Sequence, residues 1–464
     1  MPATSAAANS TRHTLLSRLP SAIEQLPLTR ARGFASLFMS VAEAPAQAPQ
    51  LYAPQFQFSQ HDSDSMRAGY GVAAQWRAAG VDRLTRLRQA ARTLQADWHC
   101  VDMDATGLTG FAMLGFAASA TATEAASSLP NALLWLPEVG LQCQGEQCGL
   151  VLTTALPASP QTVLKRWTAW LERLLPALSG SPARPLPRTE LQRAAPRPDL
   201  QDWERLVKAA LTEIAAARLQ KVVLSRQLRL TGQRRLAVAP LLTQLTRSFP
   251  SCQVISIQRD QRYFVAATPE RLLAQQGNRL EVDAIAGTVA RAAQASQDVA
   301  LSDALRSSRK DLHEHRLVID AVRTALQDHA EHIQVPAQPN IMQLNNAQHL
   351  WSPIQAELRP GIDVFQLAEL LHPTPATNGE PRQAASQWLR EMEPFERGWF
   401  TGAAGIVQPD LTGELWVLLR CAELQGQTAD LFAGAGIVPG SDPQAEWRET
   451  EDKLAAMATA LQYA

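Results

Sequence analysis

Helix-like and strand-like segments are grouped along this chain rather than alternated, and this grouping constrains the fold most. In the first half, 76–94 and 161–175 have helical apolar spacing, with Pro176 expected to end the second helix, while 107–116 and 131–141 read as strands. Parallel strands need a crossover of a dozen or more residues between them, usually a helix. Because regular strand–helix–strand alternation is missing, the sequence predicts an α+β fold.

The second half is denser in patterned elements. Its apolar spacing predicts helices over 203–214, 301–326 and 364–371, and strands over 221–230, 253–257, 263–268, 280–285, 399–407 and 414–422. The stretch 180–199 is rich in proline, arginine and small polar residues, which is typical of a linker. We therefore expect an N-terminal portion over 1–190, with only one or two short helices in its first 50 residues, and a second region over 195–464.

Composition narrows the class of protein. The 464 residues are 46% hydrophobic and 19% charged, as in a soluble globular protein with a sizeable core. The net charge of −1 gives no overall attraction to nucleic acid or to an anionic membrane, and no apolar run approaches the roughly 20 residues that span a bilayer. The polar N-terminus lacks a signal-peptide pattern and is expected to fray.

The five cysteines are Cys100, Cys143, Cys148, Cys252 and Cys421. Such a sparse, odd set in a long chain fits reduced thiols, so we expect a cytoplasmic protein.

Lysine is rare in this chain: only Lys165, Lys208, Lys221, Lys310 and Lys453 occur, and arginine carries most of the positive charge. Lysine can lose its proton whereas arginine cannot, so a lysine within a motif is a candidate for chemistry. Lys221 opens an apolar strand, where burial would disfavour the ammonium form and let the amine act as a base. A lysine that reaches solvent from a strand end explains the same pattern.

The segment 431–454 combines a glycine-rich bend with a charged helix. Ser441, Asp442 and Pro443 form the strongest helix-opening signal in the chain. After them, Glu446, Glu449 and Lys453 fall on one helix face, where they could hold a metal ion and an anion or simply be solvated.

Other candidates are weak when taken singly. Glu270 follows a strand and is either a general acid or a solvated turn carboxylate, and Arg420 ends an apolar strand, where a carboxylate clamp and a surface arginine are both open. Asp311, Glu314 and His315 share a helix face, and oxygen ligands would suit Mg²⁺. No dinucleotide fingerprint, phosphate-binding loop or nucleophile elbow is present.

Nine strings occur in a fixed order between about 200 and 460. They are KVVLSR (221–226), TPERLL (268–273), AIAGT (284–288), KDLHEHRLV (310–318), QHLWS (348–352), LHPTPA (371–376), ERGWFTGAAG (396–405), LLRCAEL (418–424) and GAGIVPGSDPQAEWRETEDK (434–453). Together they resemble the chorismate-utilising enzymes, and among these the isochorismate synthases.

The resemblance implies one large α+β domain, in which two antiparallel sheets pack together and helices surround them. It also implies that 1–190 is a variable portion that contributes to the same fold, and that 195–464 is the chorismate-binding catalytic region. Lys221 matches the family's general base, which activates water for attack on ring carbon 2 of chorismate. Glu270 matches the general acid, which protonates the hydroxyl leaving ring carbon 4. Glu314 and Glu449 match carboxylates that hold Mg²⁺, with Glu446 close by.

Further positions match residues that line the chorismate site: Gly287, Thr288, His349, Arg420, Gly434, Gly436 and Lys453. The resemblance thus implies a cytoplasmic enzyme, expected to be a monomer, that acts on chorismate with Mg²⁺ and binds neither nucleic acid nor membrane.

Two other activities stay open at this point. A salicylate synthase would go on to eliminate pyruvate from isochorismate, and a silent chorismate-binding protein would have lost a base, an acid or a metal ligand. Phe400, Cys421 and the pair Thr377–Asn378 depart from the family's usual residues, and the last lies in a loop that bears on the product. Menaquinone and siderophore pathways both use isochorismate, and the sequence does not choose between them.

Overall fold

The computed structural model describes residues 14–41, 45, 47–51, 54–105, 107–122, 129–145, 147–178, 186–345 and 347–464. The segment before residue 14, which was expected to fray, and positions 180–185 of the expected linker lie outside these ranges. Within the described ranges, no helix is long and apolar enough to cross a membrane.

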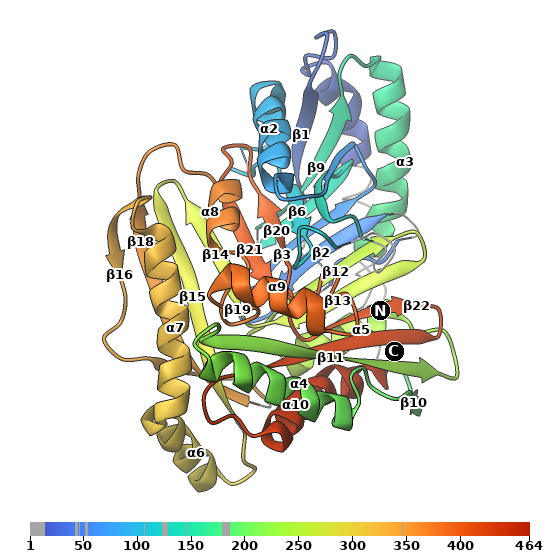
Figure 1. Ribbon diagram of the computed structural model, residues 1–464. Coiled ribbons are helices and arrows are strands. Elements are labelled where there is room, and N and C mark those ends of the chain that lie inside the picture. Colours follow the sequence, from blue (N-terminus) through green and yellow to red (C-terminus); the bar gives the residue numbers. More distant parts are fainter. Residues whose placement is uncertain are drawn as a thin grey trace.

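Two large sheets form the framework (Figure 1). The first has the order β10 (Leu191–Arg193), β11 (Lys221–Gly232), β23 (Thr428–Ile437), β22 (Cys421–Gln425), β13 (Arg262–Thr268), β12 (Gln253–Arg259), β2 (Gln55–Gln60), β3 (Ser65–Tyr70), β8 (Val139–Gln144), β9 (Gln147–Ala155), β1 (Phe34–Val41) and β5 (Trp98–Asp102), with β19 (Gly379–Glu380) paired to β11. Only the β1–β5 pairing in it is parallel among the described strands.

The second sheet is wholly antiparallel over the described residues. Its order is β16 (Ala330–Gln334), β18 (Ala347–Leu358), β15 (Arg279–Ala290), β14 (Arg271–Gln276), β21 (Gly413–Val417), β20 (Ala403–Val407), β6 (Ala112–Phe116), β7 (Ala132–Leu136) and β4 (Ala74–Ala78), with β17 (Asn340–Gln343) paired to β18. Both sheets contain strands from before residue 190 and from after residue 195.

Helices surround the sheets. They are one over 14–23, α2 (Arg83–Ala96), α3 (Pro160–Leu178), α4 (Leu200–Ala215), α5 (Val238–Ser248), α6 (Ala295–Ser307), α7 (Arg309–Leu326), α8 (Val364–Leu371), α9 (Arg382–Met392) and α10 (Pro443–Leu461). Figure 1 shows α7 running along β15, while α4 and α10 cover β11 and β23. These contacts bring α7 and α10 to the ends of the strands that build the site.

The two sheets pack face to face through an apolar core. Phe56 of β2 and Ile255 of β12 belong to the first sheet, Met113 of β6 and Ala404 of β20 belong to the second, and all four are buried in one cluster. Removing such side chains from water is the main driving force for joining the sheets. The α+β prediction, with two packed sheets and surrounding helices, is confirmed.

The chain passes from one sheet to the other at several short breaks. The predicted strands over 131–141 and 414–422 are each two strands in different sheets, so their prediction as single strands was wrong. Pro137 lies at the first break, and Arg420 lies at the second with a left-handed φ of +46°. Glu270 lies at a third break, between β13 and β14.

Two of these crossovers run side by side. The amide of Val417 donates to the carbonyl oxygen of Glu270 at 3.0 Å, and the amide of Ala267 donates to the carbonyl oxygen of Arg420 at 3.2 Å. Antiparallel pairing therefore holds Glu270 and Arg420 at the junction of the two sheets.

Three helix predictions were wrong at their boundaries. The predicted helix over 76–94 is a strand followed by α2, because Gly80 adopts a positive φ and Trp76 pairs with Leu134 in the sheet. The predicted helix over 301–326 divides at Ser308, which has extended backbone angles and caps α7. Helix α3 continues past Pro176 to Leu178: the proline removes one helical hydrogen bond near the end of the helix, and the buried side chain of Leu178 packs in the core.

Several strands also differ from prediction. The predicted strands over 107–116 and 399–407 begin only at Ala112 and Ala403, and β1, β2, β3, β9, β14 and β18 are among the strands that were not predicted.

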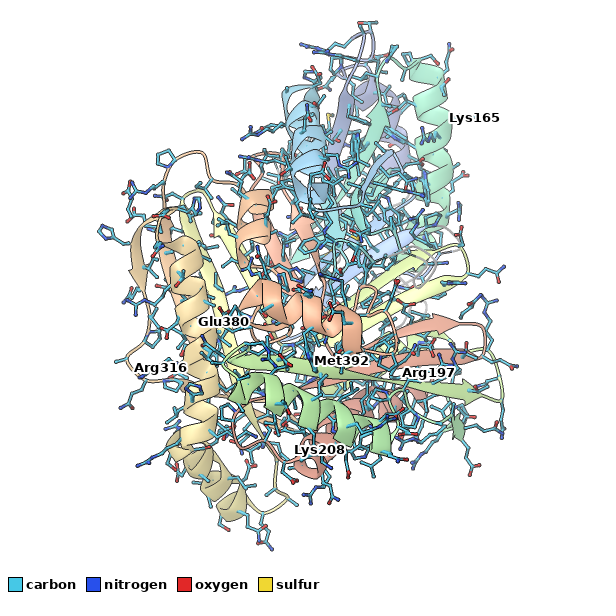
Figure 2. All side chains as sticks on the ribbon, in the orientation of Figure 1. Lys165, Arg197, Lys208, Arg316, Glu380 and Met392 are labelled. Atoms are coloured by element: carbon cyan, nitrogen blue, oxygen red, sulfur yellow. A yellow bond between two sulfur atoms is a disulfide. The ribbon has the colours of Figure 1, made fainter. Side chains whose placement is uncertain are left out.

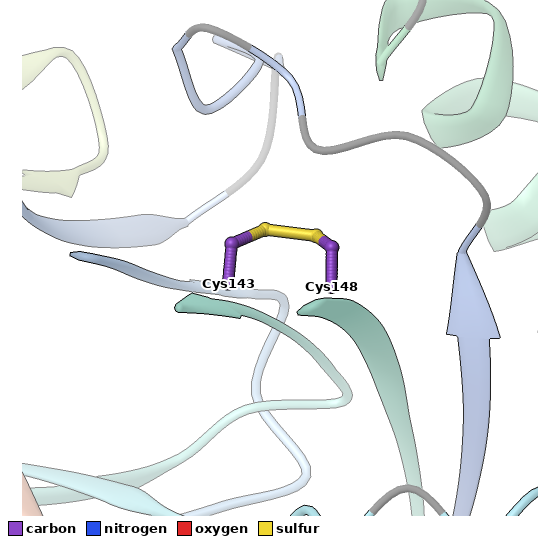
Figure 3. Close-up of a disulfide and its surroundings, with 2 residues drawn as sticks. All are labelled: Cys143 and Cys148. Carbon is purple, nitrogen blue, oxygen red and sulfur yellow. A yellow bond between two sulfur atoms is a disulfide. The ribbon is translucent and has the colours of Figure 1, made fainter. Parts of the chain in front are cut away.

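A disulfide joins Cys143 to Cys148 across the hairpin of β8 and β9 (Figure 3). The two cysteines are directly opposed in the antiparallel pairing, which places their side chains on the same face. The expectation that every thiol is reduced is therefore wrong for this pair. Cys100, Cys252 and Cys421 are free.

Candidate active site

A cavity of about 120 Å³ lies where the junction of the sheets meets α7 and α10. Eleven residues singled out from the sequence line it: Glu270, Gly287, Thr288, Glu314, His349, Arg420, Gly434, Gly436, Glu446, Glu449 and Lys453. The twelfth, Lys221, lies just behind the wall, with its Nζ atom 2.8 Å from Oε1 of Glu314. The structure thus brings together all twelve, although they span more than 230 positions of sequence.

Lys221 and Glu314 are packed against a glycine of the neighbouring strand. Lys221 is the first residue of β11 and is fully buried, and its ammonium has no hydrogen-bond partner of suitable geometry among the described residues. A Cβ atom added to Gly436 would lie 2.5 Å from Oε1 of Glu314 and 3.0 Å from Cε of Lys221. A side chain at position 436 would therefore displace the carboxylate of Glu314 and press on Lys221.

Two helices present their first turns to the cavity. Asp442 caps α10 by accepting from the amide of Ala445 at 2.8 Å, and Pro443 occupies the first turn, so the helix opening predicted at 441–443 is confirmed. Ser308 caps α7 by accepting from the amide of Asp311. The break at Ser308 places Lys310 in the first turn of α7, at the edge of the cavity.

Each predicted metal-binding carboxylate is paired with a lysine. Besides the contact between Glu314 and Lys221, Lys310 donates to Glu446 at 2.8 Å, and Lys453 donates to Glu449 at 2.7 Å. Three of the five lysines in the sequence therefore lie in this one cluster.

These pairings alter the acidity of the groups. Burial raises the pKa of Glu314, but the charges of Lys221, Lys453 and Lys310 outweigh it and leave that pKa lowered. Burial works to lower the pKa of Lys310, yet the hydrogen bond that it donates to Glu446 and the charges of the nearby carboxylates raise that pKa overall. Both groups therefore favour their charged forms.

Glu270 behaves oppositely. Its side chain is only 4% exposed, and burial, assisted by the charge of Asp283, raises its pKa to about 8 despite opposing effects of Lys221 and Lys453. At neutral pH this carboxyl group holds a proton, so it can donate one to a leaving group.

A chain of hydrogen bonds links Arg420 to the cavity wall. Nη2 of Arg420 lies 3.2 Å from Nε2 of His349, whose Nδ1 lies 3.0 Å from Oγ1 of Thr288. Burial, and then the charges of Arg420 and Lys453, lower the pKa of His349 well below its usual value. Because a guanidinium only donates, Nε2 accepts, and the neutral ring carries its hydrogen on Nδ1. Thr288 then accepts from His349 and keeps its own hydroxyl hydrogen for a ligand.

Arg420 also has an unsatisfied donor. Its Nη1 atom is buried and has no hydrogen-bond partner among the described residues. A buried charged donor without a partner is costly, so this atom indicates a place for an anion such as a carboxylate.

Sequence reasoning missed a buried ion pair beside the cavity. The carboxylate of Glu393 accepts from both Arg397 and the amide of Ser225, and Arg397 also donates to the carbonyl oxygens of Val223 at 2.6 Å and Thr377 at 2.7 Å. This pair fixes two segments of the wall. Arg397 lies in the string ERGWFTGAAG, but only its contacts in the folded structure reveal its role.

Sequence reasoning also passed over Lys310 as a site residue. The scarcity of lysine was the signal that could have found it, because Lys310 lies beside the same polar helix face as Asp311 and Glu314.

The three carboxylates Glu314, Glu446 and Glu449 offer hard oxygen ligands, and Lys310 stands as a cation among them. This donor set fits Mg²⁺, which binds through one or two carboxylates and several waters. As the side chains of the described residues stand, no three histidine, cysteine or acidic groups are arranged to hold a metal ion.

Comparison with known proteins places the chain in a family. The profile of the chorismate binding enzyme family matches residues 37–462. Isochorismate synthase MenF of Escherichia coli strain K12 is 30% identical over 418 residues, which cover 89% of each chain. Isochorismate synthase MenF of Bacillus subtilis strain 168 is 34% identical over 268 residues, 58% of this chain, and the chain spans only 57% of that relative's length.

Among solved structures, the menaquinone-specific isochorismate synthase MenF from Escherichia coli superposes with a TM-score of 0.76 at 26% identity. The match covers 98% of this chain and 100% of that one, so the similarity includes the whole framework of both sheets.

Proposed function

Because the chain belongs to the chorismate binding enzyme family, we propose that it is an isochorismate synthase, an isomerase that converts chorismate to isochorismate. One observation carries the proposal: a glutamic acid with a raised pKa and a buried arginine with an unused donor line one cavity, and a buried lysine lies just behind its wall. These are a base, an acid and an anion clamp, which are the groups that the reaction needs.

The proposed reaction replaces one hydroxyl group by another. A water oxygen attacks ring carbon 2 of chorismate, the ring double bonds shift, and the hydroxyl group on carbon 4 leaves as water. Lys221, in its neutral form, takes a proton from the attacking water, and Glu270 gives a proton to the leaving hydroxyl. Water enters and water leaves, so substrate and product are isomers.

The substrate is a dianion, and the cavity offers separate places for its carboxylates. Nη1 of Arg420 supplies a charged donor, and Thr288 supplies a hydroxyl whose hydrogen is free because His349 donates to its oxygen. Gly434 and Gly436 let the β23 backbone approach closely, and Lys453 of α10 and Gly287 of β15 also line the cavity. Holding the ring in one orientation lowers the entropic part of the barrier.

In this proposal Glu314 and Glu449 would hold Mg²⁺, with Glu446 close by. The ion would neutralise and position the carboxylate on the ring. The fit rests on three carboxylates that line one cavity and on the lysine cation among them.

The test is to incubate the purified protein with chorismate and Mg²⁺ and to separate the products by chromatography. Isochorismate as the sole product is expected, and its formation should stop when EDTA removes the metal. Salicylate with an equal amount of pyruvate would identify a salicylate synthase instead, and unchanged chorismate would identify a silent binding protein.

A further inference from the structure

Lys310 differs from the other two lysines of the carboxylate cluster in how it is held. The side chain of Lys221 is fully buried, and Lys453 is bound by both Glu449 and the carbonyl oxygen of Gly434. The side chain of Lys310 is 40% exposed, and Glu446 is the one hydrogen-bond partner of its ammonium group among the described residues. Lys310 can therefore swing into solvent without breaking a second bond.

The charges around Lys310 are those around the proposed metal. Its ammonium group is attracted by Glu446, Glu314 and Glu449, the same three carboxylates that are proposed to surround Mg²⁺. Glu446 is buried, with a side chain only 3% exposed, and an unpaired carboxylate there would be costly. When no metal is present, Glu446 therefore needs either a cation or a proton, and its 2.8 Å contact with Lys310 supplies the cation.

We propose that Lys310 is a built-in counter-cation of the site: its ammonium group holds Glu446 until Mg²⁺ binds, and it then withdraws to solvent. Lys310 and the metal compete for one carboxylate, so Lys310 sets the affinity for Mg²⁺. This inference deepens the proposed function and rests on its metal site.

The direction in which the affinity for Mg²⁺ changes on removal of Lys310 shows whether Lys310 competes with the metal or supports its binding. If Lys310 competes, its removal frees Glu446 and tightens metal binding. If Lys310 instead orients Glu446 for the metal, its removal loosens binding, because the carboxylate loses the group that positions it.

The experiment measures the dissociation constant of Mg²⁺ by calorimetry on metal-free protein. Lys310→Met should bind Mg²⁺ at least tenfold more tightly than the wild-type protein. Lys310→Arg keeps the charge and can pair with Glu446 through two donors, so it should bind no more tightly than the wild type.

The matched control is Lys208→Met, which removes a lysine from α4 on the outside of the molecule (Figure 2). The side chain of Lys208 is 70% exposed and pairs with Glu204 at 4.0 Å, so its removal should leave the Mg²⁺ affinity unchanged. Equal or weaker binding by Lys310→Met, with a native circular dichroism spectrum, would overturn the inference.

The experiments distinguish a failure of the proposed isochorismate synthase activity from a failure of the proposed role of Lys310. Wild-type protein that forms isochorismate, together with a Lys310→Met variant of unchanged Mg²⁺ affinity, would overturn only the role of Lys310. Protein that forms no isochorismate but shows tighter binding in Lys310→Met would overturn the activity and leave the counter-cation in place.

Discussion

Arg420 donates from Nη2 to Nε2 of His349 across 3.2 Å, which couples an arginine at a sheet crossover to a histidine near the start of β18. The contact fixes the histidine as a neutral ring with its hydrogen on Nδ1, since Nε2 must accept. It also leaves Nη1 of Arg420 as the donor without a partner among the described residues.

Replacing Arg420 should weaken substrate binding before it affects folding. In Arg420→Lys, a point charge replaces a planar fork, and the contact to His349 is lost as well. We expect the dissociation constant for chorismate to rise about 100-fold, or about 3 kcal/mol, as measured by calorimetry. The control Arg229→Lys alters an exposed pair with Asp430 and should bind chorismate normally. Normal binding by Arg420→Lys would contradict the clamp.

Lys221→Ala should abolish isochorismate formation while chorismate still binds in the presence of Mg²⁺. Loss of a general base typically costs about 10²–10⁴ in rate, which single-turnover assays can measure. Lys165→Ala, on the outer helix α3, is the matched control with a full rate (Figure 2). If Lys221→Ala turns over normally, the base has been assigned to the wrong residue.

The reaction should slow as the pH rises through about 8. Glu270 must carry a proton to act as the acid, and its pKa is raised to about 8, so the acid is present below that pH and lost above it. The profile of kcat/KM against pH measures this limb. Glu270→Gln should lower the rate about 10²–10⁴-fold and remove the limb. A wild-type rate that stays constant from pH 6 to 10 would exclude this role.

Asp283 offers a control for the same assignment. Its charge helps to raise the pKa of Glu270, so Asp283→Asn should move the basic limb to lower pH.

The stability of the protein should also depend on the protonation of Glu270. Because the pKa of Glu270 is raised above the ordinary 4.5, the folded state loses stability as the pH rises from 4.5 through about 8. Thermal unfolding of Glu270→Gln should show less of this loss.

Gly436→Ala should inactivate the enzyme, because the new methyl group would overlap Oε1 of Glu314 and press on Lys221. We expect a loss of about 1–3 kcal/mol in the free energy of unfolding, together with loss of turnover. Gly426→Ala is a useful control, since its positive φ also makes it costly but nothing lies within 4 Å of the added carbon. If Gly426→Ala is destabilised to a similar extent but keeps full activity, the lost turnover of Gly436→Ala results from the change in the site and not from lower stability.

Local signals predicted local structure well. The helix opening at 441–443 was found because Asp442 and Pro443 satisfy the first turn by themselves, without help from distant residues. The helix boundary at Ser308 was missed because the apolar periodicity continues across it. The segments 131–141 and 414–422 were each predicted as a single strand, because an apolar run does not indicate which sheet each part of it joins.

The candidate residues were found by type and by resemblance, and their roles stay predictions. What could not be predicted was their pairing: Lys310 and Glu446 are 136 positions apart, and Lys221 meets Glu314 only because β11 and α7 converge. Lys310 was passed over for this reason, since its partner lies on another helix.

The sequence by itself determined the α+β class, the start of α10 and the residue types of the site, since these depend on neighbouring residues and on the rarity of lysine. Only the tertiary structure decided that Glu270 and Arg420 lie on adjacent crossovers, that His349 is neutral, and that each proposed metal-binding carboxylate is paired with a lysine. Such properties depend on burial and on distances between remote segments, and these exist only once the two sheets have packed.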